Sequence, residues 1–183
     1  LAVTTAAALE PLSVVDQRGK SVALPRPPQR IVTIPIPAAS NVITVDGTVD
    51  HLVGMHPSAK EAIEQGIFGA IFPKARAVRS DITGQSFMPN IESLLSVRPD
   101  VVIQWANQGA DLIPAVERLG LPVLGISYGT EDLARGAFVM YGQMLGKEAR
   151  AAEIIAYRDK MLKRLDAALS GLTEEQKPRV LHL

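Results

Sequence analysis

The chain has 183 residues, which is enough for one large domain or for one domain and part of a second. Its 19 Lys and Arg residues balance its 19 Asp and Glu residues, so no net charge favours nucleic acid or an anionic membrane surface. The lack of Cys excludes disulfides, thiolate chemistry and Cys-ligated zinc, and no apolar run reaches the roughly 18 residues of a membrane span.

The first elements predict a hairpin. Residues 1–11 begin with small apolar side chains, which is typical of either the remnant of a cleaved secretory signal or an ordinary frayed terminus. Two short β-prone runs follow at residues 12–16 and 21–24. The turn between them contains Gly19, which suits the left-handed position of a hairpin turn. A Pro-rich connector at 25–28 ends the pairing.

Apolar runs of strand length then alternate with helical patterns. We predict strands at residues 30–34, 52–55, 101–103 and 122–126, with a further short strand at 77–79. We predict helices at 38–49, 59–65 (capped by Ser58), 91–98, 110–119 and 131–145, and an irregular segment at 66–74. The alternation indicates βαβ units, and hence a Rossmann-like α/β lobe over residues 12–146 with a mainly parallel, helix-covered sheet.

The segment from Asn90 to Trp105 is the most informative. Asn90 is a good N-cap, Glu92 suits the positive end of the helix dipole, and Pro99 stops the helix. Residues 101–103 are apolar on both faces, as in a buried parallel strand, and we expect Trp105 in the loop that follows. Ligands bind at such carboxyl ends of strands in open α/β sheets.

The end of the chain predicts a connection to a second lobe. A long helix with an apolar stripe covers about residues 147–171 and ends near Gly171. Residues 178–183 then have the pattern of a strand. We interpret this strand as the first of a C-terminal lobe, most of which lies outside this sequence, and the helix as the link between the lobes.

Four segments, in this order, resemble the class III solute-binding proteins of ABC importers. They are the opening hairpin and first core strand (14–32), the run N-I-E-S-L-L…R-P-D-V-V-I (90–103), L-G-L-P-V (119–123) and L-G-K-E…A (145–151). The resemblance implies two α/β lobes joined by one long helix, with a ligand held between them. It also implies a protein outside the cytoplasm, in the periplasm or at the cell surface, that works as a monomer with a membrane permease and its ATPase subunits.

The resemblance also implies ligands and individual residues. Known ligands of the family include ferric siderophores, haem, cobalamin, oxyanions and bare metal ions. Glu92 matches a glutamate that pairs with permease arginines, and Trp105 matches a position where cobalamin-binding members place a ligand-contacting Trp. One departure is that the loop at 35–41 lacks the Glu that is customary there.

The residues themselves suggest a binding edge. We expect a ligand to meet strand ends and the loops beside them, where aromatic and polar side chains gather. The candidates are Pro37, Ser40, His56, Gln85, Ser86, Phe87, Trp105, Asn107, Gln108, Ser127 and Tyr128. Two alternatives stay open: Trp105 packs beneath its own loop, or His56 is structural.

Catalysis has little support in the sequence. Residues 125–129 fit G-x-S-x-G, but only His182 follows as a possible partner, and no Walker loop, dinucleotide fingerprint or HExxH motif occurs. We therefore expect no enzyme, no catalytic residues, no cofactor and no resident metal. The absence of a dense set of His, Asp and Glu residues favours an iron chelate, haem or cobalamin over a bare ion. The alternatives are a lobe of a two-lobe enzyme or a sensor domain.

Overall fold

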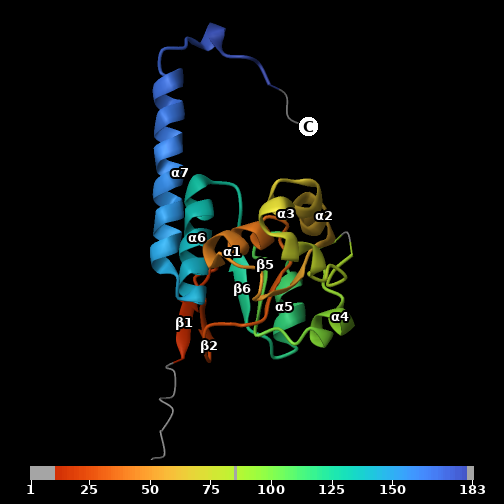
Figure 1. The fold of residues 1–183 in the computed structure, drawn as a ribbon. Helices are drawn as coiled ribbons and strands as arrows, with labels where there is room; N and C mark the ends of the chain where they lie inside the picture. The colour runs from red at the N-terminus through yellow and green to blue at the C-terminus, as the bar shows by residue number, and fades with distance from the viewer. Residues whose placement is uncertain (1–10, 85, 181–183) are drawn as a thin grey trace, which may run out of the picture.

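The computed structural model describes residues 11–84 and 86–180. It contains a parallel four-stranded sheet in the order β4-β3-β5-β6 and a separate antiparallel hairpin, β1-β2 (Figure 1). The strands are β1 (Leu12–Val15), β2 (Ser21–Leu24), β3 (Ile31–Thr33), β4 (Leu52–Met55), β5 (Val101–Trp105) and β6 (Val123–Ile126).

Helices cover both faces of the sheet. They are α1 (Ala38–Asp46), α2 (Pro57–Gln65), α3 (Phe68–Ile71), α4 (Ile91–Ser96), α5 (Leu112–Glu117), α6 (Glu131–Leu145) and α7 (Glu148–Leu169), with 3-10 turns η1 (Pro73–Ala77) and η2 (Glu174–Gln176). Val101 and Ile103 belong to a hydrophobic cluster with the hairpin, α1, α2 and α6, whereas Val102 belongs to a second cluster with α4 and α5. This alternation along β5 is the two-residue period of a strand buried on both sides.

Most predicted elements are confirmed, and the differences are local. Helix α1 ends at Asp46 because Gly47, at φ +74°, adopts the left-handed conformation and donates its N–H to the Ile43 carbonyl. Helix α2 begins at Pro57, and its cap is His56 rather than Ser58, because the His56 Nδ1 accepts the Ser58 N–H at 3.1 Å.

Three further expectations were wrong in detail. Residues 66–74, expected to be irregular, form α3 and the start of η1. The strand expected at 77–79 is reduced to an isolated bridge between Gly54 and Arg79. Trp105 is the last residue of β5 instead of a loop residue, since it pairs with Ile126 of β6.

The hairpin turn closes the edge of the sheet at β6. Asp16 Oδ2 accepts the Gly125 N–H at 2.8 Å, and the Gln17 N–H donates to the Gly125 carbonyl at 3.1 Å. A Cβ at Gly125 would lie 2.8 Å from the Arg18 Nε, so glycine leaves room for the Arg18 side chain over the strand. The Gln17 Oε1 also accepts the Ser127 N–H at 2.6 Å, which fixes the carboxyl end of β6.

Helix α7 packs on α6 near its start and then runs past the end of the fold where α6 begins (Figure 1). Only Ala151 of this helix is buried, and Leu165 and Leu169 are more than half exposed. No helix in the described ranges is long and apolar enough to cross a membrane. The strand expected at 178–183 is not formed by residues 178–180, and residues 1–10 and 181–183, which include His182, lie outside the description.

Candidate functional site

The carboxyl ends of the four parallel strands meet at one edge of the sheet. His56 directly follows β4, Trp105 ends β5, and Ser127 and Tyr128 follow β6. The loop from 86 to 89 lies against this edge, because Gln104 of β5 donates its Nε2 to the Phe87 carbonyl at 2.9 Å. The strand ends and loops of the predicted binding edge therefore lie together, and we call this edge the rim.

Four rings form a row along this rim, which we call the aromatic row. The ring centroids of His56 and Phe87 lie 5.3 Å apart, those of Phe87 and Trp105 5.8 Å, and those of Trp105 and Tyr128 5.1 Å. The last two pairs meet edge to face, which is the arrangement that ring quadrupoles favour. Each ring comes from a different segment of the chain, so packing in three dimensions creates the row.

His56 is buried and neutral. Its Nδ1 accepts the Ser58 N–H, which places the proton of the neutral ring on Nε2. Burial lowers the pKa of His56, and a backbone group of Ser86 partly opposes this shift. The Nε2 is buried and, within the described ranges, forms no hydrogen bond of full geometry, although the Ser86 backbone lies near enough to act on the ring.

Trp105 is packed rather than open. The residue is 7% exposed, and its ring makes T-shaped contacts with both Phe87 and Tyr128. Its Nε1 is buried and has no partner among the described residues. This geometry favours the alternative in which the Trp supports the rim, and it leaves the half-buried Phe87 and Tyr128 as the accessible rings.

Tyr128 is positioned by a residue that sequence reasoning missed. The Asn41 Nδ2 of α1 donates to the Tyr128 hydroxyl oxygen at 3.0 Å. Burial raises the pKa of Tyr128, while the Asn41 hydrogen bond and the charge of Arg158 act in the opposite direction. The hydroxyl is therefore neutral at pH 7 and can donate toward a ligand. The only available sequence signal was a polar side chain on a mostly apolar helix.

Gln104 is the second missed residue. It is fully buried, its Oε1 accepts the Trp105 N–H at 2.7 Å, and its Nε2 holds the Phe87 carbonyl. An amide inside an otherwise apolar strand was the signal that could have identified it. Its role is to fix the loop that presents Phe87.

The remaining predicted residues are dispersed around the rim. Ser86, Asn107 and Gln108 are exposed in loops beside the row, and Gln85 lies outside the described residues. Pro37 and Ser40, at the start of α1, line a separate apolar groove beside α2 and α3.

Glu92 stands apart from the rim, whereas Ser127 lies on it without a catalytic partner. Glu92 is exposed in the first turn of α4 and makes no ion pair with any described residue. Ser127, the serine of the G-x-S-x-G match, makes no hydrogen bond with a His in the described part of the chain. No group of three or more His, Asp or Glu side chains suited to a metal occurs there either.

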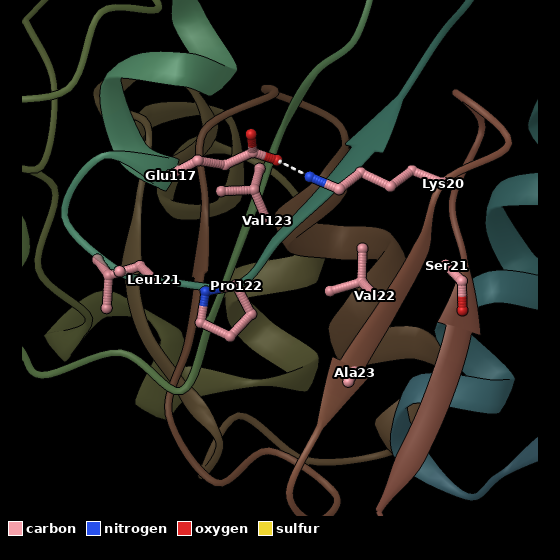
Figure 2. A pocket seen from close by; sticks show the side chains of 9 residues that line it. Lys20, Ser21, Val22, Ala23, Glu117, Leu121, Pro122 and Val123 are labelled. Atoms are coloured by element: carbon pink, nitrogen blue, oxygen red, sulfur yellow. Dashed lines mark hydrogen bonds and ion pairs between the residues drawn. The ribbon is translucent and has the colours of Figure 1, made fainter.

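A different hollow, of about 350 Å³, lies at the amino end of β6, between that strand and β2 (Figure 2). The Lys20 Nζ and Glu117 Oε1 face each other across it at 2.8 Å. The Lys20 hydrogen bond, with a second one from Arg18, lowers the pKa of Glu117 against the opposing effect of burial. These charges already neutralise each other, and none of the predicted site residues lines this hollow.

Known proteins resemble this chain in sequence and in fold. It is 25% identical over 159 residues to the iron-uptake system-binding protein of Bacillus subtilis (strain 168), an alignment that covers 83% of this chain and 47% of that protein. A periplasmic solute binding protein from Veillonella parvula DSM 2008 superposes with a TM-score of 0.83 and 31% identity, over 90% of this chain and 50% of that one.

A third relative shares the fold alone. The molybdate periplasmic binding protein MolA of Haemophilus influenzae superposes with a TM-score of 0.75 at 17% identity, over 91% of this chain and 56% of that one. No family model matches the chain. These comparisons confirm the resemblance to solute-binding proteins and the α/β fold class. The chain spans about half the length of these relatives, and all three are binding proteins rather than enzymes.

Proposed function

We propose that this chain forms one lobe and the linking helix of an extracytoplasmic solute-binding protein of an ABC importer, and that its ligand is an iron chelate held between this lobe and a second one. The observation that carries the proposal is the aromatic row at the carboxyl edge of the sheet. Support comes from the 31% identity to a periplasmic solute binding protein over about half of that protein.

The chemistry of the rim favours an organic chelate. Its accessible groups are the rings of Phe87 and Tyr128 and neutral donors such as the Tyr128 hydroxyl. Such a wall makes dispersion contacts and a few hydrogen bonds with a bulky ligand, whereas a bare cation requires several carboxylate or imidazole ligands. The similarity to an iron-uptake system-binding protein supports iron as the metal of that chelate. Haem and cobalamin are the other candidates.

The connection between α6 and α7 favours a small closing motion. Arg158 of α7 makes two hydrogen bonds to the Glu131 carboxylate of α6, at 2.5 and 2.6 Å, and Arg135 of α6 pairs with Asp159 of α7. A helix anchored in this way behaves as a stiff link between lobes. A ligand that contacts both lobes then stabilises the closed arrangement through its differential contacts.

The partners follow from the same proposal. Glu92 contacts a basic surface of the membrane permease, and ATPase subunits drive release and transport. The protein acts as a monomer outside the cytoplasm. An ion pair at an exposed carboxylate such as Glu92 weakens with salt, so we expect Glu92→Gln to reduce transport and the salt dependence of docking without changing ligand affinity.

The proposal is tested with the product of the complete gene. Ferrioxamine B (a linear ferric trihydroxamate), haem and cyanocobalamin are titrated against it, with tryptophan fluorescence quenching and calorimetry as readouts. We expect one of these chelates to bind and Phe87→Ala to weaken that binding by about fivefold, because a ring contact contributes about 1 kcal/mol.

Phe138→Ala is the matched control, since Phe138 is a half-buried ring on α6 outside the aromatic row. The Phe138→Ala variant should bind the same chelate with the affinity of the unaltered protein. Failure of all three chelates to bind, or an equal loss in both variants, would overturn the proposal.

A further inference from the structure

An apolar groove of about 360 Å³ opens between the start of α1 and the corner that joins α2 to α3. Ala59 and Ile63 form its floor and are 3% and 4% exposed. Pro37 belongs to one wall, and Ile67, which is 77% exposed, lies at the other. Figure 1 shows α2 and α3 close to α1, at the end of the fold past which α7 extends.

Two glycines build the corner that shapes this groove. A Cβ on Gly66 would lie 2.7 Å from the Ala62 carbonyl oxygen, and a Cβ on Gly69 would lie 2.4 Å from the Ile63 carbonyl oxygen. Only glycine allows α3 to fold back so closely on the end of α2. The groove is therefore a consequence of tight helix packing.

The groove offers no free hydrogen-bonding side chain. Ser40 is the only polar side chain among the residues that line it, and its hydroxyl donates to the Pro37 carbonyl at 3.1 Å. A polar group placed there would lose its hydration without gaining a partner, whereas an apolar group gains from leaving water. The chemistry of the groove thus selects an apolar occupant.

The groove and the aromatic row share their framework. His56, the first ring of the row, is the N-cap of α2 and precedes the groove floor at Ala59 by one helical turn. Pro37 follows β3, the strand next to β4 in the sheet. One ligand can therefore lie along the row and extend into the groove.

We propose that the groove holds an alkyl or aryl arm of the ligand, so that the preferred substrate class is an amphiphilic metal chelate. The chelating core rests on the aromatic row and the apolar arm lies on Ala59 and Ile63, against Ile67. This inference rests on the proposed function. Each methylene that becomes fully buried tightens binding by about fourfold.

The test uses ferrioxamine B whose terminal amine carries an acetyl, butanoyl, hexanoyl or octanoyl group, so that the iron core is constant. Affinity for the product of the complete gene is measured by tryptophan quenching and calorimetry. We expect binding to tighten by at least about tenfold from the acetyl to the octanoyl chelate.

Ala62→Phe fills the groove, because Ala62 lines it and is exposed. This variant should bind the acetyl chelate normally and lose the dependence on chain length. Ala70→Phe makes the same change at an exposed position of α3 that does not line the groove, and it should keep that dependence. Ile67→Ser alters only an exposed side chain and should reduce the gain for the octanoyl chelate by severalfold.

The outcomes separate the two proposals. The groove proposal is overturned if the acetyl chelate binds and chain length has no effect. It is also overturned if Ala62→Phe and Ala70→Phe show the same chain-length effect. Either result leaves the proposed function standing. Failure of every acylated chelate to bind overturns the groove. Failure of unmodified ferrioxamine B, haem and cyanocobalamin as well overturns the proposed function with it.

Discussion

Replacing Asp16 with Asn should weaken the contact between the hairpin turn and strand β6 and so destabilise the protein. The Asp16 side chain is fully buried, and its Oδ1 accepts the Arg18 N–H at 2.9 Å and the Lys20 N–H at 3.1 Å. Its Oδ2 accepts the Arg18 Nε–H at 2.6 Å and the Gly125 N–H at 2.8 Å. Donors thus face both oxygens, and either orientation of an amide would place an NH₂ group against them.

The magnitude follows from this geometry. Disrupting a buried ion pair while its cationic partner remains costs about 3–5 kcal/mol. The total stability of a domain is about 5–15 kcal/mol, so the variant should lose a large fraction of it. With a urea dependence of about 2 kcal/mol per M, the unfolding midpoint of Asp16→Asn should fall by about 2 M.

Urea unfolding of the full-length protein, followed by circular dichroism, measures this loss. The control is Asp81→Asn, because the Asp81 pair with Arg79 is about half exposed and water screens it. The control should shift the midpoint only slightly. Equal shifts in the two variants, or a loss below about 1 kcal/mol for Asp16→Asn, would refute the view that this carboxylate anchors the edge strand.

Three further predictions concern the rim and the groove. Burial lowers the pKa of His56 below its ordinary value of 6.5, so the unfolded chain gains a proton that the folded chain does not as the pH falls through about 6.5. The free energy of unfolding should therefore decrease below that pH. His56→Asn, which keeps a capping acceptor, should flatten this dependence in urea titrations at successive pH values; an unchanged slope would contradict the assignment. Gly69→Ala should destabilise the protein by about 1–3 kcal/mol in thermal unfolding, because its Cβ would meet the Ile63 carbonyl oxygen at 2.4 Å. Tyr128→Phe removes the acceptor for Asn41 and should cost about 1 kcal/mol in urea unfolding while keeping the ring; no loss would show that this hydrogen bond does not contribute.

Local signals explain why several elements could be predicted closely. Helix α6 has its predicted bounds because the Thr130 hydroxyl accepts the Leu133 N–H at 3.2 Å and Gly146, at φ +64°, ends the helix. Both signals lie within one turn of the helix ends. Strand β4 also has its predicted bounds, Leu52–Met55, because the signals that end it are adjacent in the sequence.

Elements that depend on distant partners could not be predicted in this way. Helix α3 has only four residues, and its formation depends on the packing of Gly69 against the end of α2. Strand β5 extends to Trp105 because Ile126 of β6 provides a ladder partner there. His56 caps α2 with its ring nitrogen, a role that sequence patterns assign more readily to Ser58.

The candidate binding edge likewise combines features that the sequence indicated with features that depend on distant contacts. The sequence indicated that His56, Phe87, Trp105 and Tyr128 lie near strand ends, but it did not specify that their rings would touch. Trp105 turned out to be covered, because neighbouring rings from other segments close over it.

By itself, the amino-acid sequence determined the alternation of strands and helices, the caps of α4 and α6, and the resemblance to solute-binding proteins, since each depends on residues a few positions apart. Only the tertiary structure decided the strand order β4-β3-β5-β6, the aromatic row and the apolar groove. The physical reason is that these features arise from contacts across long separations, such as the 87 positions between Asn41 and Tyr128. No periodicity along the chain encodes such contacts.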